Sequence, residues 1–196
     1  EILSGLVGSE MCIRDRAGNV QIQVLDREGK PVPDAVVVVY PGATAGAAPS
    51  LLQPSPTIEQ ERMRFVPAVT VVMPGTTVRF TNQDRWDHHV RGNPTGVAAA
   101  AAPAAPSSNF ELRLAGKADG KPANFADVKL DTPGVVLLGC HLHGSMRGHV
   151  FVTDSAWTLK TDNDGIARFA SVPDGAAQVR VCLLYTSPSP RDQRGS

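Results

Sequence analysis

The sequence has no apolar run that approaches the roughly 20 residues a membrane-spanning helix needs. It has no excess charge of either sign: 19 basic and 19 acidic residues give no support for binding to nucleic acid or to an anionic membrane surface. It also has no CxxCH haem motif, no phosphate-binding loop and no HExxH motif. The function must therefore be sought in other residues.

Aromatic residues make up only 5% of the chain, and no segment has the pattern of a long helix. Glycine and proline are abundant, at 18 and 16 residues, and valine is concentrated in short runs. This composition is typical of a β protein with many turns. Many short strands at nearly regular spacing predict an all-β sandwich or barrel.

The strands are expected where apolar residues alternate or form short β-branched runs. They are residues 20–25, 35–40, 64–72, 76–82, 110–114, 126–130, 135–138 and 149–152. Residues 41–57 are predicted to be a loop, and the Ala/Pro-rich residues 92–108 an exposed insertion. Residues 159–181, with two Asp-Gly turns, indicate a second small β unit that is cut short.

Both ends of the chain resemble translated sequencing-adaptor sequence, one for each strand of the adaptor. The first contains Met11-Cys12-Ile13-Arg14-Asp15, and the second begins at Cys182. We therefore expect residues 1–16 and 182–196 to be artefacts and the remainder to be a fragment without its true ends. Cys140 is then the only authentic cysteine, so no internal disulfide is expected, and a missing export signal says nothing about location.

One loop combines a thiolate, an imidazole and a thioether, in Cys140, His143 and Met146. A second imidazole is available upstream, at His88 or His89. Neighbouring residues of a strand point to opposite faces, so only one of these two histidines should reach the site. Two imidazoles, a thiolate and a weak axial thioether are the ligand set of a blue-copper site.

These residues lie in a pattern that resembles the cupredoxins. Cys140-x-x-His143-x-x-Met146-Arg147-Gly148-x-Val150 looks like their copper loop, with a spacing closest to that of amicyanin, and Asn82 followed by His88-x-Val90 is similar to their upstream segment. Residues 64–153 are similar to plastocyanin-like domains, and residues 20–181 to proteins often labelled methylamine utilisation protein. Asp87 departs from the usual proline before the ligand, and His89 from the asparagine that braces the copper loop.

The resemblance implies a Greek-key β-sandwich of the cupredoxin type at residues 17–154, followed by a truncated β unit at residues 155–181. It further implies one mononuclear type 1 copper held by His88, Cys140, His143 and Met146. The protein would carry single electrons and would not be an enzyme. Its partner would be a redox protein such as a cytochrome c or a dehydrogenase, and it would be periplasmic or otherwise exported.

Other interpretations of the same residues remain open at this point. Zinc accepts cysteine and histidine, but it has no use for the thioether of Met146. A catalytic Cys140 nucleophile would need only a nearby histidine, although no oxyanion arrangement accompanies it. A copper carrier without redox turnover, or a β-sandwich interaction module, is the alternative from another functional class.

Overall fold

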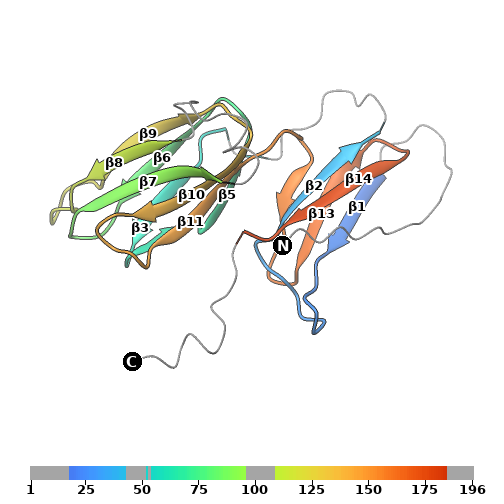
Figure 1. Ribbon diagram of the computed structural model, residues 1–196, viewed down its shortest axis with the longest axis horizontal. Helices are drawn as coiled ribbons and strands as arrows, with labels where there is room; N and C mark the ends of the chain where they lie inside the picture. The colour runs from blue at the N-terminus through green and yellow to red at the C-terminus, as the bar shows by residue number, and fades with distance from the viewer. Residues whose placement is uncertain (1–17, 43–51, 53, 96–108, 185–196) are drawn as a thin grey trace. The chain divides into compact units, whose positions relative to one another are not determined.

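The computed structural model describes residues 18–42, 52, 54–95 and 109–184. Within these ranges every regular element is a β-strand, which confirms the predicted all-β class (Figure 1). None of these residues belongs to a helix long and apolar enough to cross a membrane. Contacts divide the chain into two compact units, one of residues 50–156 and one that combines residues 1–49 with 157–196.

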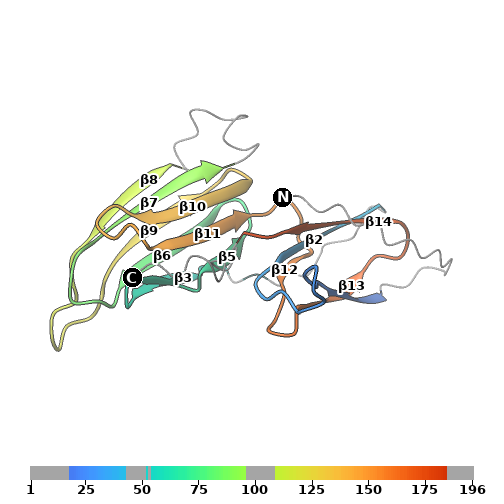
Figure 2. The same cartoon turned by 60° about the horizontal axis from the view of Figure 1, so that its bottom comes forward.

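The larger unit contains nine of the strands. They are β3 (Thr57–Glu61), β4 (Arg64–Val66), β5 (Val69–Val72), β6 (Thr76–Asn82), β7 (His88–Thr95), β8 (Phe110–Leu114), β9 (Asn124–Leu130), β10 (Gly134–Cys140) and β11 (Arg147–Val152). They form a five-stranded sheet in the order β5-β11-β10-β7-β8 and a four-stranded sheet in the order β4-β3-β6-β9. Figure 2 shows these two layers, with β8, β7 and β10 in one and β9, β6 and β3 in the other.

The two sheets enclose one hydrophobic core, which makes the larger unit a β-sandwich. Buried residues alternate with partly or fully exposed ones along β6 and with partly exposed ones along β10, as expected of strands with one face on the core. Ile58 and Phe80 come from the four-stranded sheet, and Val90 and Leu138 from the five-stranded sheet. The chain passes between the sheets by crossover connections, so that β7 pairs with β10 and β11 with β5. This is the predicted Greek-key sandwich architecture.

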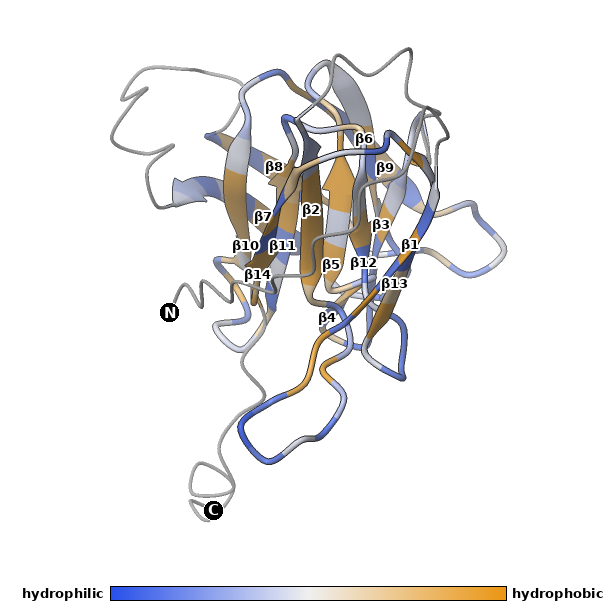
Figure 3. Cartoon of the chain, turned by 90° about the vertical axis from the view of Figure 1, so that its right-hand side faces the viewer, coloured by the Kyte–Doolittle hydropathy of each residue, from blue (hydrophilic) through white to orange (hydrophobic). Residues whose placement is uncertain are grey.

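The smaller unit is built from both ends of the described chain. It contains β1 (Gly18–Gln23), β2 (Val36–Pro41), β12 (Thr158–Lys160), β13 (Ile166–Val172) and β14 (Ala177–Cys182). Strand β1 pairs with β13, and β2 lies between β12 and β14. Four consecutive valines of β2, residues 36–39, are buried. Figure 3 shows that hydrophobic residues are concentrated in strands while many connecting turns are hydrophilic.

This pairing differs from the division predicted from the sequence. Residues 17–154 were expected to form one domain and residues 155–181 a separate appendage. Instead β1 and β2 pair with strands that follow residue 157. The sequence did not predict this pairing, because the partner strands lie far away in the chain and no local pattern reveals them. The expected artefacts at residues 1–16 and 185–196 lie outside the described residues, and Cys182 pairs with Val36 as the last residue of β14.

Three strand predictions also need correction. Strand β7 continues to Thr95, so residues 92–95 belong to the sheet and not to an insertion; residues 96–108 lie outside the described part. The expected strand at residues 64–72 is divided into β4 and β5, which belong to different sheets, and Pro67 lies between them. Strand β3 was not predicted; it begins at Thr57, the last residue of the predicted loop 41–57, and continues to Glu61.

Candidate metal centre

Two neighbouring strands and one loop bring the candidate ligands to one end of the sandwich. His88 is the first residue of β7, and Cys140 is the last residue of β10. Val90 lies opposite Cys140 in the antiparallel pairing, so His88, two residues earlier, points to the same face. Hydrogen bonds from His141 N to His89 O and from Met146 N to His143 O continue the ladder and turn the loop back toward β11.

The nitrogen and sulfur atoms of three side chains converge. The Nδ1 atoms of His88 and His143 are 3.2 Å apart, and Cys140 Sγ lies 3.6 Å from the first and 3.5 Å from the second. A circle through the corners of a triangle with these sides has a radius of about 2.0 Å. Protein nitrogen and sulfur ligands lie about 2.0–2.3 Å from a metal such as zinc. The three side chains therefore fit one metal ion.

The cluster is shielded from water. His88 is 0% exposed, Cys140 is 5% exposed and Met146, from the same loop, is 1% exposed. Cys140 and Met146 also belong to the hydrophobic core of the sandwich. His143 is only partly buried and lies between the exposed residues Leu142 and Gly144. The site is therefore closed on the core side and approaches solvent at His143.

The other three histidines lie outside this cluster. His89 projects from the opposite side of β7, where its Nε2 lies 3.2 Å from Glu111 Oε2 and its ring contacts that of the exposed His141. His149 lies on β11; its Nδ1 is buried without a hydrogen-bond partner, and burial lowers the pKa of its ring. Of the two upstream histidines, the structure brings His88 to Cys140 and His143.

The sequence reasoning missed Asp84, whose carboxylate lies behind His88. Asp84 Oδ2 is 2.9 Å from His88 Nε2, and both residues are buried. The carboxylate also accepts hydrogen bonds from the backbone N–H groups of Arg62 and Met63, at 2.7 and 3.0 Å. Burial by itself would raise the pKa of Asp84, but the hydrogen bonds from Met63, His88 and Arg62 outweigh it and lower the pKa.

An ionised carboxylate can only accept hydrogen bonds, so the proton of neutral His88 is on Nε2. The Nδ1 lone pair then points toward Cys140 and His143, where a metal would need it. A carboxylate that holds the far nitrogen of a ligand histidine in this way fixes its orientation and raises its basicity. The available signal in the sequence was the position of Asp84, four residues before His88, but Asp87, which directly precedes His88, was an even nearer candidate.

Asn82 holds the turn that carries Asp84. Its side-chain oxygen accepts the Asp84 N–H at 2.9 Å, and its Nδ2 donates to the carbonyl oxygens of Trp86 and Leu114 at 2.8 and 3.1 Å. The same turn passes close to Gly116, where an added Cβ would lie 2.1 Å from Arg85 O. Only glycine fits there. These contacts keep Asp84 and His88 in fixed positions.

Comparison with family models and with curated proteins found no match. Among solved structures, the copper-containing nitrite reductase NirK from Thermus scotoductus SA-01 matches at 19% identity over 56% of this chain and 27% of its own, with a TM-score of 0.41. The chain thus spans about a quarter of that reductase. Amicyanin from Paracoccus versutus matches at 17% identity over 60% of this chain and 97% of its own, with a TM-score of 0.39. Plastocyanin from Dryopteris crassirhizoma matches at 23% identity over 50% of this chain and 99% of its own, with a TM-score of 0.36.

Proposed function

We propose that this chain is a type 1 copper protein that carries single electrons between redox partners. The observation that carries the proposal is the triangle of His88 Nδ1, Cys140 Sγ and His143 Nδ1, with buried Met146 in the same loop. Two imidazoles and a thiolate with a weak thioether are the ligands of copper electron-transfer sites. Met146 would hold the copper weakly, together with His88, Cys140 and His143.

The burial of the site favours this function over the alternatives. A nucleophilic cysteine must meet its substrate, but Cys140 and its neighbour His88 are both buried. A structural zinc site commonly takes a fourth cysteine, histidine or carboxylate. The carboxylate of Asp84 instead faces the far nitrogen of His88.

Bound copper would supply the chemistry by alternating between its two oxidation states. The protein's part is to keep the ligands in one arrangement during that change. His88 and Cys140 are fixed by β7, β10 and the Asp84 hydrogen bond, while a short turn fixes the loop that carries His143. Of the four proposed ligands, His88, Cys140 and Met146 are buried and His143 is partly exposed, so we assign electron entry and exit to the edge at His143.

The electron partner would be another redox protein, such as a cytochrome c or a dehydrogenase, and the chain would act in the periplasm or otherwise outside the cytoplasm. Both inferences rest on the similarity of the Cys140–Met146 loop to the copper loops of amicyanin and plastocyanin. The chain would then act on no substrate of its own.

The test is a titration of the metal-free protein with Cu(II). We expect one equivalent of copper to produce an intense visible thiolate-to-copper charge-transfer band that ascorbate bleaches reversibly. His88→Ala should abolish the band, and the matched variant His89→Ala should retain it, because His89 faces Glu111 on the other side of β7. A pale complex would instead indicate a copper carrier, no uptake would indicate an interaction module, and equal losses in the two variants would refute the ligand assignment.

A further inference from the structure

A pair of arginines flanks a glycine on the outer face of the five-stranded sheet. On β10 the residues Val136, Leu138 and Cys140 are buried, so Gly139 and Leu137 face away from the core. In the pairing, Gly139 lies opposite Arg147 on β11 and opposite Arg91 on β7. Because glycine has no side chain, the space between the two arginine side chains is left open above the strand.

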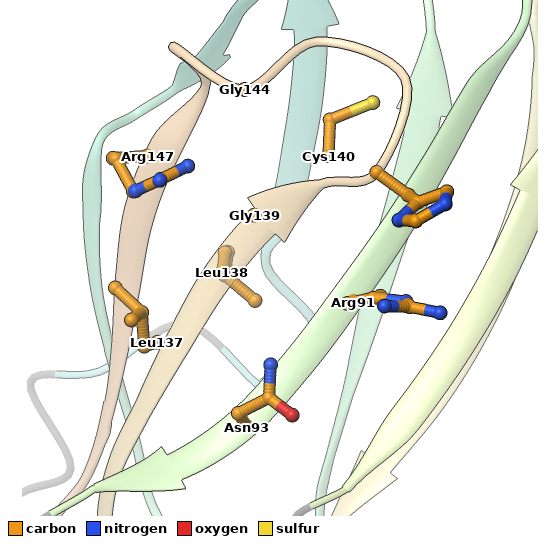
Figure 4. Close-up of a pocket in the computed structure, with 9 residues that line it drawn as sticks. Arg91, Asn93, Leu137, Leu138, Gly139, Cys140, Gly144 and Arg147 are labelled. Atoms are coloured by element: carbon orange, nitrogen blue, oxygen red, sulfur yellow. The ribbon is translucent and has the colours of Figure 1, made fainter.

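This space is a cleft of about 290 Å³. Arg91 and Arg147 lie on opposite sides of Gly139, as Figure 4 shows, and the lining also includes Leu137, Leu138, Asn93, His141 and Gly144. Gly139 and Cys140 line it as well, so it lies directly behind the strand that carries the candidate thiolate ligand. A Cβ added at Gly139 would lie 3.8 Å from Arg147 Nη1, so the Arg147 guanidinium borders the space above Gly139.

The charge at the cleft is mostly positive. Arg91 Nε lies 2.9 Å from Glu111 Oε1 but is not aligned for a hydrogen bond, and the other oxygen of Glu111 faces His89. Arg147 donates Nη1 to the carbonyl of Met146, and none of the ion pairs found among the described residues includes it. One carboxylate thus offsets two guanidinium groups.

We propose that this cleft binds an organic carboxylate. Guanidinium groups present planar pairs of donors that match the two oxygens of a carboxylate. Leu137 offers an apolar contact for the aliphatic carbons next to that group, which inorganic phosphate lacks. The size of the cleft suits one acidic side chain of a partner protein or one small dicarboxylic acid. Binding requires no metal, so this inference is independent of the proposed electron transfer.

The experiment is a ¹⁵N NMR titration of the full metal-free chain at constant ionic strength. The probes are glutarate, as a free dicarboxylate, hexaglutamate, as an acidic protein surface, and inorganic phosphate, as a comparison. We expect glutarate or hexaglutamate to shift the Gly139 amide and the side-chain resonances of Arg91 and Arg147. Hexaglutamate that binds at least tenfold more tightly than glutarate identifies a protein partner; equal or tighter binding of glutarate identifies a small acid. Phosphate that binds as tightly as both overturns the carboxylate assignment.

Variants separate the cleft from general positive charge. Arg91→Gln and Arg147→Gln should each weaken binding about threefold to fivefold, in line with partly exposed ion pairs. Arg113→Gln is the matched control, since it removes the same charge from the same sheet face, beside His89 and outside the cleft. Gly139→Val fills the cleft without changing its charge and should abolish the shifts. An equal loss in Arg113→Gln, or unchanged binding in Gly139→Val, overturns the proposal.

Discussion

Asp84→Asn changes one oxygen of the carboxylate behind His88 and leaves its size almost unchanged. Oδ2 accepts hydrogen bonds from Met63 N and His88 Nε2, and Oδ1 accepts one from Arg62 N. An amide has a single acceptor oxygen. The least costly orientation places that oxygen where Oδ2 lies and turns the NH₂ group toward the Arg62 N–H. One backbone donor then loses its partner.

The expected cost has two parts. An unpaired, partly buried N–H destabilises the fold by about 1–3 kcal/mol. His88 keeps an acceptor but loses the negative charge, which weakens its hydrogen bond and lowers its basicity. Outer partners of metal ligands typically contribute about 10- to 100-fold to metal affinity. Because an acceptor remains, we expect about a tenfold loss of copper affinity, equivalent to about 1.4 kcal/mol.

Urea unfolding of the metal-free protein would measure the first part, and competition with a copper chelator the second. Asp127→Asn is the control, since Asp127 is an exposed carboxylate that pairs with Arg79 on the four-stranded sheet. That variant should unfold at nearly the same urea concentration as wild type and bind copper normally, because an exposed ion pair contributes little to stability. If Asp84→Asn matches the control in both measurements, Asp84 neither supports the turn nor orients His88.

Three further predictions concern residues around the same site. Met146→Leu conserves core volume and should cost less than about 1.5 kcal/mol of stability, but it should shift the reduction potential of the copper protein, measured by voltammetry; an unchanged potential would exclude Met146 as a ligand. Asn82→Ala should lower the free energy of unfolding, measured in urea, by about 2–4 kcal/mol, because several buried hydrogen bonds around the 84–88 turn are lost. A loss below about 1 kcal/mol would show that the turn is stable without the Asn82 side chain. Burial lowers the pKa of His149 below 6.5, so its contribution to stability is complete above pH 6.5 and is lost as the pH falls through the folded-state pKa. His149→Gln should therefore reduce the loss of stability between about pH 7.5 and pH 5.5, whereas the exposed His141→Gln should not, and equal pH dependence in wild type and His149→Gln would contradict the role of burial.

The sequence predicts the parts of the site that lie close together in the chain. Cys140, His143 and Met146 occupy one loop, so their spacing alone indicates a shared centre. The choice of His88 over His89 depends on which face of β7 looks inward, and the sequence leaves that open. Asp84 depends on a turn held by Asn82 and by the backbone of residues 62 and 63, which are contacts between strands and have no local pattern.

The sequence likewise predicts where strands lie but not which strands pair with one another. Alternation and turn residues predict strands at residues 20–25 and 35–40, and strands are found there with bounds shifted by one or two residues, as β1 (Gly18–Gln23) and β2 (Val36–Pro41). Neither pattern names a partner strand, and the partners lie more than 100 residues away. Pairing over such a distance is decided by which buried faces match, as between the valines of β2 and the strands on either side of it.

The position of β2 between β12 and β14 has a consequence for the order of folding. During synthesis the valines at residues 36–39 emerge early, but both neighbouring strands emerge only after the whole larger unit has been made. The larger unit is contiguous and can fold first, which brings β2 and β12 closer together and reduces the entropy lost when they pair. Until then β2 is an unpaired, valine-rich strand, and such a strand in the nascent chain needs protection from aggregation.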